Sequence, residues 1–382
     1  MKYKEFKKTL QYRNYNRLQI FLRFLEYKIK RLLINLIIKF NLKISNSKVL
    51  IDLGSFKDNR YINYLIYALK NDFIFLYKED KNSEKLFHRI GFLNFFKYTA
   101  SNSKYVNKAK IKIQFNKQNL KKNELYINTN YFRFFYNNEQ IDEKKILMPY
   151  YMYPRVYNSY YKKIIIKKKP DFNLRIFFSG SIFNEVYNNF TWNVEPEKFP
   201  NRVRIINKII KEFETEIFFI KSKKDIYSNE ITKKKIIFCL HEKMIKKTSY
   251  ILSFKDNFNF LNKSCFHLSC PGAVMPLCHH LIEGMKVGSI PITNCEKLLY
   301  PNLNLNMSLQ YADLNQINTQ VKKALDMKKD EIIFMREKVF EYYEKYLSPE
   351  RFKEKFIDAI NQNKKEIICC DDHRSIHKKL HH

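Results

Sequence analysis

The sequence has little glycine, little proline and almost no tryptophan. Among its 382 residues are six glycines, ten prolines and one tryptophan, and no proline precedes Pro149. This composition excludes collagen-like and Pro/Gly-rich low-complexity chains. The 45% of hydrophobic residues, with 27 Tyr and 33 Phe, supply ample apolar surface for a globular protein. Because the chain is longer than one ordinary core requires, two domains are expected.

Acidic side chains are also scarce. The 38 Asp and Glu are outnumbered by 71 Lys and Arg, which gives a formal net charge of +33. A positive field of this size favours anionic partners such as nucleic acid, acidic lipid or phosphorylated small molecules. Lysines are spread along the whole chain, together with many Asn, Ile, Tyr and Phe, so compositional bias accounts for part of the charge.

Long hydrophobic runs and a paired cysteine framework are both missing. The longest uncharged run, Ser264–Ile282, has 19 residues. It contains three histidines, Pro271, Gly272 and Pro276, and therefore lacks the sustained hydrophobicity of a membrane span. The seven cysteines are an odd number and lie in the second half. The N-terminus lacks the apolar core and cleavage site of a signal peptide. We therefore expect a cytoplasmic protein.

Residues 1–45 predict a basic amphipathic N-terminal extension. They hold 12 Lys or Arg and two acids, with apolar residues at approximate helical spacing. Such a helix can lie on an anionic membrane surface, which would make the protein peripheral on the cytoplasmic face of a membrane. It can equally be an ordinary helix packed on the first domain, and the sequence leaves both interpretations open.

The remaining chain alternates between strand and helix patterns. Val49–Ser55 predicts a buried strand ending at a glycine turn, and a helix near Tyr61–Lys70 and a strand at Phe73–Tyr77 complete a βαβ unit. Leu174–Ser181 repeats the pattern of strand and glycine turn. The fold class is therefore α/β with two Rossmann-like domains. Their predicted bounds are 46–150 and 171–328, with an interdomain connection at 151–170, C-terminal helices at 329–366 and an irregular tail at 367–382.

Three of the six glycines fall within one segment, Cys265–Ile292. It predicts a strand, a Pro-Gly loop, a helix beginning near Pro276 and ending at Gly288, and a second strand. The amino end of a helix beneath a glycine loop suits a diphosphate. Glu283 lies four residues after His279, on the same helical face, where its carboxylate can accept both hydrogen bonds of a ribose diol. Gly284 would leave room for that ligand.

This segment resembles the donor-binding motif of GT-B glycosyltransferases, in particular of exostosin-like families. The matching letters are Pro271-Gly272, Pro276–His279, Ile282–Met285 and Gly288–Ile292, while Gly284 and His280 replace the more frequent Ala and Asn. The resemblance implies two Rossmann-like domains facing across a cleft. It also implies metal-independent transfer of a sugar from a nucleotide-sugar donor to a glycan or lipid-linked acceptor. The N-terminal domain would bind the acceptor and the C-terminal domain the donor.

The same resemblance implies roles for individual residues. Glu283 would contact the donor ribose, and Arg202 or Arg175 would neutralise the diphosphate. The other implied donor-binding residues are Ser179, Gly180, Ser181, Gly272, Ala273, Pro276 and His279. An inverting reaction needs a general base, for which Asp52 and Asp58 are the candidates, although each also fits a structural or solvated aspartate. A retaining reaction needs no such base.

Other interpretations of the sequence are open. The histidines and cysteines of residues 265–280 tempt a zinc assignment, but their spacing does not match a tetrahedral site, so neither a metal nor a cofactor is predicted. The net charge and the aromatic residues also fit a basic nucleic-acid-binding protein, although no recognisable binding motif is present. A catalytically inactive GT-B scaffold would carry the same sequence features.

Overall fold

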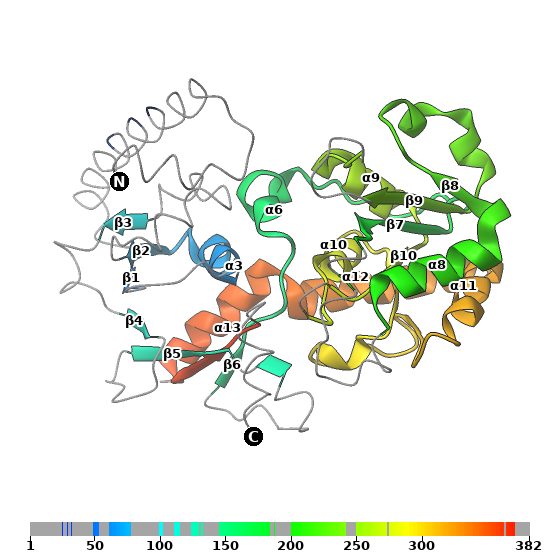
Figure 1. The fold of residues 1–382 in the computed structure, drawn as a ribbon. Helices are drawn as coiled ribbons and strands as arrows, with labels where there is room; N and C mark the ends of the chain where they lie inside the picture. The colour runs from blue at the N-terminus through cyan, green and yellow to red at the C-terminus, as the bar shows by residue number, and fades with distance from the viewer. Residues whose placement is uncertain are drawn as a thin grey trace.

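The computed structural model describes residues 25, 29, 32, 49–52, 61–77, 99–101, 111–114, 124–129, 131–132, 145–183, 187, 200–241, 250–272, 275–362 and 364–370. In these residues the strands form two sheets, each with helices packed against it (Figure 1). Every strand pair in both sheets is parallel. The protein is therefore mixed α/β, in agreement with the predicted class.

The first sheet has seven strands in the order β3-β2-β1-β4-β5-β13-β6. Apart from β13, this is the 3-2-1-4-5-6 order of a Rossmann fold. Helix α3 (Tyr61–Leu69) joins β1 to β2, and all of its residues are buried, as its nearly continuous apolar sequence requires. The strands are β1 (Val49–Asp52), β2 (Phe73–Tyr77), β3 (Thr99–Ser101), β4 (Ile111–Gln114), β5 (Glu124–Asn128), β6 (Lys145–Leu147) and β13 (Glu366–Ile368).

The second sheet has six strands in the order β12-β11-β10-β7-β9-β8. From β7 the chain first adds β8 and β9 on one side and then β10, β11 and β12 on the other. The order therefore switches direction between β7 and β10, and open parallel sheets bind ligands beyond the carboxyl ends of the strands at such a point. The strands are β7 (Ile176–Ser181), β8 (Ile217–Phe219), β9 (Ile236–His241), β10 (Phe266–Leu268), β11 (Ile290–Thr293) and β12 (Leu309–Gln310).

Helices α8 (Arg202–Phe213), α9 (Phe254–Lys263), α10 (His279–Lys286) and α11 (Ile317–Asp326) flank this second sheet. The structure confirms the predicted strand at 73–77 with the same bounds. Strand β9 and helices α9 and α11 have no counterpart among the predicted elements. The connection between the halves contains a short helix, α6 (Pro154–Ser159), whose first residue is a proline, as is common at a helix start.

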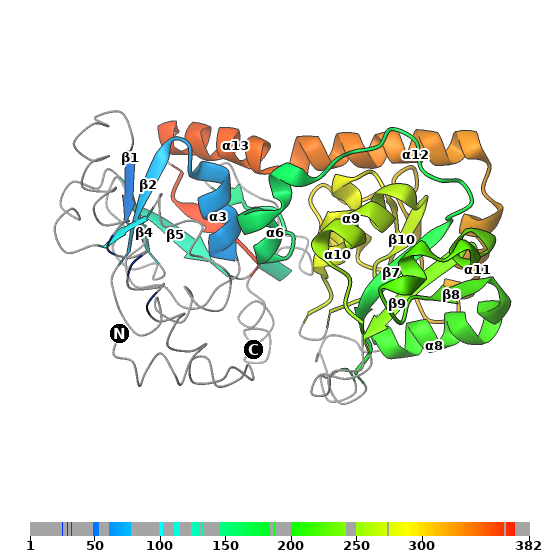
Figure 2. The same ribbon diagram turned by 90° about the horizontal axis from the view of Figure 1, so that it is seen from above.

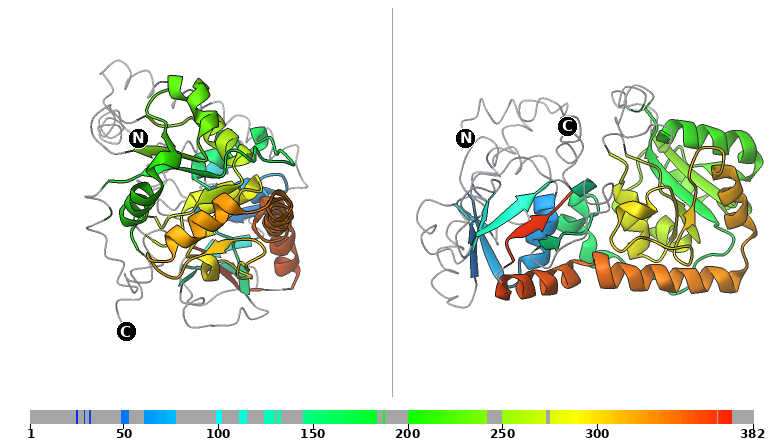
Figure 3. Two further views of the ribbon diagram at one scale, coloured as in Figure 1. Left: turned by 90° about the vertical axis from the view of Figure 1, so that its right-hand side faces the viewer. Right: turned by 90° about the horizontal axis from the view of Figure 1, so that it is seen from below.

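The end of the chain returns to the first half. Helices α12 (Lys329–Tyr342) and α13 (Pro349–Asn361), with a π-helical turn η9 (Tyr343–Leu347) between them, run along one side of the molecule from the second sheet to the first (Figures 2 and 3). Ser348 follows η9 and caps α13, because its side chain accepts a hydrogen bond from the Arg351 N–H. Tyr64 of α3 donates to the carbonyls of Leu347 and Ser348.

Residues 366–368 are a strand rather than the junction of a helix and an irregular tail, so the prediction is wrong there. Strand β13 lies between β5 and β6, pairing Glu366 with both Tyr126 and Lys145. The physical reason is the apolar run Ile367–Cys370, in which each residue is almost completely buried. Four consecutive apolar residues are the pattern of a strand covered on both faces.

A buried arginine on α12 links several elements of the second half. Arg336 is 3% exposed, and its guanidinium donates to four backbone carbonyls. The acceptors are Ser264 O at 2.9 Å, Val287 O at 2.9 Å, Asn262 O at 3.2 Å and Lys167 O at 3.4 Å. Asn262 lies in the last turn of α9 and Val287 ends α10, where the helix dipoles favour a cation. Burial lowers the pKa of Arg336 to about 10, which leaves it charged at neutral pH.

Helix α10 packs so closely on β10 that Gly284 has no room for a side chain. A Cβ at Gly284 would lie 2.4 Å from Nδ1 of His267, the central residue of β10. His267 is fully buried, and this burial lowers its pKa to about 3, so its ring is neutral. The expectation that Gly284 leaves room for a ligand is therefore wrong, because the His267 ring occupies that space.

We predict that Gly284→Ala destabilises the protein by about 1–3 kcal/mol, because either the His267 ring or α10 must move. Urea denaturation measures this cost. His267→Ala alone should also be destabilising, since it opens a cavity. The double variant should lose less stability than the sum of the two single losses, because the new methyl group enters the vacated space. Additive losses would show that a methyl group at position 284 and the His267 ring do not compete for the same space.

Candidate functional site

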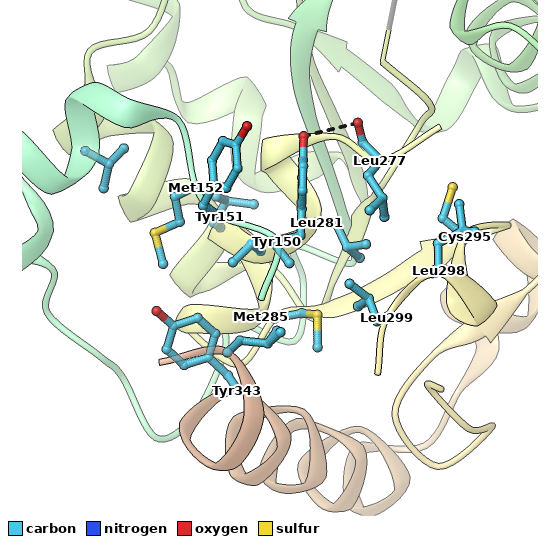
Figure 4. Packing of buried hydrophobic residues seen from close by; sticks show 14 of the residues in the cluster. Tyr150, Tyr151, Met152, Leu277, Leu281, Met285, Cys295, Leu298, Leu299 and Tyr343 are labelled. Carbon is cyan, nitrogen blue, oxygen red and sulfur yellow. Dashed lines mark hydrogen bonds between the residues drawn. The ribbon is translucent and has the colours of Figure 1, made fainter. Parts of the chain in front are cut away.

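The carboxyl ends of strands from both sheets meet around the loop that follows β10. Tyr131 lies beyond β5, Tyr150 beyond β6 and Cys370 beyond β13. Each contacts a residue that lies beyond β10 or β11 in the second sheet, and Figure 4 shows the Tyr150 contact within the buried cluster. The contacts are Tyr131 Oη donating to Leu298 O at 3.0 Å, Tyr150 Oη donating to Leu277 O at 3.3 Å, and Cys370 Sγ with Met275 Sδ at 3.5 Å.

The loop after β10 makes a close turn before α10 begins. At Gly272, a Cβ would lie 3.0 Å from the Met275 carbonyl and 3.1 Å from the Leu277 carbonyl, so the chain folds back tightly there. Helix α10 starts at His279 with Cys278 as its N-cap, and no side chain caps it. The predicted start near Pro276 is therefore wrong. Pro276 is buried in the loop, where its carbonyl accepts a hydrogen bond from the Cys295 thiol at 3.4 Å.

A buried arginine lies at the carboxyl end of β7. Arg202, the first residue of α8, is 5% exposed. Its Nη1 donates to the Ser181 carbonyl at 3.3 Å and its Nη2 to Cys278 Sγ at 3.2 Å, while its Nε is buried without a partner. Its guanidinium carbon lies 5.0 Å from the centre of the Tyr187 ring. None of the ion pairs found between described residues involves Arg202.

Two histidines lie in the surroundings of this arginine. The register of β7 and β9 places His241 opposite Ser181, and the His241 Nε2 is buried without a partner. Burial and then the Arg202 cation lower the pKa of His241, and the same two causes lower the pKa of His280 well below its usual range. Both imidazoles are therefore neutral at pH 7. We call Ser181, Arg202, His241, Cys278 and His280 the Arg202 cluster.

A side chain at position 180 would press against this arginine. A Cβ at Gly180 would lie 3.1 Å from Arg202 Nη1 and 3.0 Å from the Phe178 ring. Ser181 contributes its carbonyl to Arg202 and its hydroxyl to a 3.0 Å hydrogen bond with Tyr187 Oη. Ser179 is buried instead, opposite Cys239 in the register of β7 and β9. Of these three predicted residues, the structure brings Gly180 and Ser181 to Arg202.

His279 and Glu283 both face the interdomain connection. The ring Nδ1 of His279 lies 2.9 Å from the Tyr151 carbonyl. Glu283 is 4% exposed, and its Oε1 accepts a hydrogen bond from the Tyr153 N–H at 3.1 Å. Its Oε2 accepts from Asn257 Nδ2 at 3.5 Å. Burial raises the pKa of Glu283 to about 7, although the Tyr153 hydrogen bond opposes the shift. These contacts join α10 to the connection and to α9.

Four predicted residues remain, of which the structure describes Arg175 and Asp52. Arg175 precedes β7 and donates to the Met327 carbonyl. It therefore lies at the amino ends of the strands, whereas Arg202 lies at their carboxyl ends. The expectation of a phosphate role for Arg175 is wrong. Asp52 is the last residue of β1, at the carboxyl edge of the first sheet. Asp58 and Ala273 lie outside the described residues.

His241 is not among the predicted site residues, because β9 was not predicted as a strand. The signal is the apolar run Ile236–Leu240, which ends in a polar residue just as β7 ends in Ser181. Since β9 adjoins β7 with both strands parallel, the last residues of the two strands must be neighbours. Recognising the run as a strand would have added His241 to the candidate site.

Comparison with known proteins gives a weak structural similarity and no similarity in sequence. The sequence matches no protein-family model and no curated protein. Among solved structures, the chain is similar to the wall teichoic acid polymerase TagF, with 13% identity, full coverage of both chains and a TM-score of 0.28. The similarity is weak. At this level, the fold assignment depends on the sheet order and helix packing described above.

In the part of the chain that the structure describes, no group of three or more His, Cys, Asp or Glu side chains is arranged to hold a metal ion. No helix in it combines the length and the apolar character needed to cross a bilayer.

We predict that Glu283→Gln changes the pH dependence of stability. Since the pKa of Glu283 is raised to about 7, the folded protein retains a proton that the unfolded chain releases above about pH 4.5. The wild type should therefore lose stability, on the order of 3 kcal/mol, as pH rises from about 4.5 to 7. The variant should lack this loss and be the more stable protein at pH 8. Chemical denaturation at pH 5 and pH 8 measures the difference.

The matched control is Glu337→Gln, which removes an exposed carboxylate from α12. Its pH dependence should follow that of the wild type. If the Glu283→Gln curve also runs parallel to the wild-type curve, the carboxyl group of Glu283 is not held protonated in the folded protein.

Proposed function

We propose that the protein is a glycosyltransferase that moves a sugar from a nucleotide-sugar donor to a glycan or lipid-linked acceptor. The observation that supports this most directly is the buried Arg202 guanidinium, which has no carboxylate partner among the described residues. A buried charge without a counter-ion costs several kcal/mol. A bound diphosphate would supply that counter-ion through charge-assisted hydrogen bonds.

The surroundings of Arg202 support a diphosphate in particular. The uncapped amino end of α10 begins at Cys278, whose thiol contacts the same guanidinium, and helix amino ends favour anions. The neutral rings of His241 and His280 can donate N–H groups without adding charge. The cluster lies at the carboxyl end of β7, beside the switch between β7 and β10, where parallel sheets bind nucleotides.

We assign the donor ribose to Glu283, as the resemblance to GT-B enzymes implies. The Tyr153 N–H and the Asn257 amide orient the Glu283 carboxyl group, which belongs to the same helix as the proposed phosphate site. A ribose diol that donates to this group would favour its ionised form. His279, Gly272 and Pro276 would shape the rest of the donor pocket. The exostosin-like assignment depends on this motif alone.

The acceptor would approach from the first half, across a cleft between the two halves. The contacts of Tyr131 and Tyr150 with the second half support this arrangement, because they bring the carboxyl edges of the sheets together. Asp52, at that edge, remains our candidate for the general base of an inverting reaction. We expect no metal, since Arg202 and the α10 dipole can stabilise a leaving diphosphate.

We predict that a nucleotide sugar raises the melting temperature of the wild type and that Arg202→Met abolishes this shift. UDP-, GDP-, CMP- and ADP-sugars are screened by thermal shift, since a ligand that binds the native state stabilises it. Without ligand, the variant should melt no lower than the wild type, because methionine fills the space and removes an unpaired buried charge. Arg204→Met, an exposed position two residues further along α8, is the matched control and should keep the shift.

The screen also separates the alternatives. A donor-induced shift that survives Arg202→Met would contradict the diphosphate role of Arg202. A shift with oligonucleotides and none with nucleotide sugars would favour a nucleic-acid-binding protein. Donor binding without sugar transfer to any acceptor would favour an inactive scaffold. Where transfer occurs, Asp52→Asn should abolish it while leaving the donor shift intact, and undiminished turnover would exclude Asp52 as the base.

We also propose that the N-terminal extension attaches the protein to an anionic membrane. Leu25, Ile29 and Leu32 are helical and are 45%, 53% and 66% exposed. Their spacing places them on one helical face, and the lysines and arginines of residues 1–45 would meet lipid phosphates. The other residues of 1–45 lie outside the described part of the chain.

Replacing Leu25, Ile29 and Leu32 together by serine should release the protein from vesicles that contain phosphatidylserine, because the face that enters the bilayer is lost. Co-sedimentation measures the bound fraction. The fold should tolerate the changes, since all three side chains are exposed, and circular dichroism checks this. Equal sedimentation of variant and wild type would mean that these side chains do not enter the membrane.

A further inference from the structure

A cavity of about 310 Å³ lies between the two halves and shares no lining residue with the Arg202 cluster. Its walls come from β6 and the residues just after it, from Tyr131, from residues 299–300 of the second half, and from η9, α13 and the residues that follow α13. We call it the interdomain cavity. Its volume lies at the lower end of the range for small-molecule sites. A ligand in it would contact both halves of the protein at once.

The lining of the interdomain cavity is cationic. Lys145, Lys355 and Lys364 line it, and Asp358 is the one acid among its lining residues. The ammonium group of Lys355 lies 5.6 Å from the centre of the Tyr346 ring. Partial burial, followed by the nearby cations Arg351 and Lys345, lowers the pKa of Lys355. An anion beside Lys355 would offset its repulsion by Arg351 and Lys345, and a phosphate group suits several ammonium donors.

Aromatic rings form the second feature of the cavity. Tyr300 belongs to its lining and is 54% exposed, so its ring is open to a ligand. Tyr346, from η9, lines the cavity beside Lys355. Tyrosine offers an apolar face and a polar hydroxyl, a combination that suits a ring bearing both C–H and O–H groups. The lysines and tyrosines together therefore fit a ligand with one phosphate group and one sugar ring.

We propose that the interdomain cavity binds a small phosphorylated sugar, with the phosphate on Lys355 and Lys364 and the sugar ring against Tyr300. This site is separate from the proposed donor site and does not depend on the proposed glycosyl transfer. Because the walls belong to both halves and to the helices that join them, the bound molecule stabilises one arrangement of the halves.

Isothermal titration calorimetry of the full chain with glucose phosphate tests the proposal, with glucose and inorganic phosphate as the partial ligands. Glucose phosphate should bind more tightly than either partial ligand. Lys355→Ser combined with Lys364→Ser should weaken its binding by about tenfold or more, since two charge-assisted contacts are lost. Tyr300→Ser should weaken glucose phosphate and leave inorganic phosphate unchanged. Lys338→Ser, which removes a lysine of α12 paired with Glu341, is the matched control.

Arg202→Met separates the two sites. It should leave the binding of glucose phosphate unchanged even though it removes the proposed donor shift. Three outcomes would overturn the proposal: no heat of binding at millimolar glucose phosphate, full affinity in the double lysine variant, or loss of binding in Arg202→Met. Equal affinity for inorganic phosphate and glucose phosphate would also overturn it, because the tyrosines would then contribute nothing.

Discussion

The second half of the protein depends on one desolvated cation, Arg336. The guanidinium of this α12 residue donates to the backbone at the ends of α9 and α10, between α9 and β10, and in the interdomain connection. Each of these carbonyls would otherwise need a partner in the interior, and unsatisfied buried carbonyls are costly. The same contact fixes the end of α10, and therefore the position of its amino end near Arg202. The candidate site is thus positioned by a residue that does not belong to it.

The two buried arginines of this half differ in how their charge is satisfied. The partners of Arg336 are carbonyl oxygens, two of them at helix ends whose dipoles favour a cation. Arg202 has one carbonyl, one thiol and an unused Nε. Around Arg202, the neighbouring imidazoles His241 and His280 are neutral, so the positive charge is concentrated on a single side chain. An arginine of the first kind stabilises a fold, whereas one of the second kind suits a ligand that arrives with its own negative charge.

Much of the fold could be predicted from the sequence. Its strands are short, continuous apolar runs, as in β2 and β7. Helix α8 begins with the capping residue Asn201 and continues in an amphipathic pattern. The predictions were wrong where contacts between distant parts of the chain determine the local structure. The start of α10 depends on how the chain folds back between Gly272 and Leu277, and the space at Gly284 depends on a side chain from another element. The same limit applies to the candidate site. The resemblance pointed to Glu283 and to either Arg202 or Arg175. The neighbours of Arg202 follow from the pairing of β7 with β9, which local sequence does not contain.

The place of β13 in the first sheet has a consequence for synthesis. Residues 366–368 lie between β5 and β6, so the two strands on either side of the gap are made more than two hundred residues before the strand that fills it. On the ribosome, the second half can close its own sheet while β5 and β6 still have unpaired edges. The usual order, in which the N-terminal domain folds first during translation, is therefore reversed for this sheet. Until the last helix and strand emerge, those edges are sites for mispairing, which makes the nascent first half the part of the chain most in need of a chaperone.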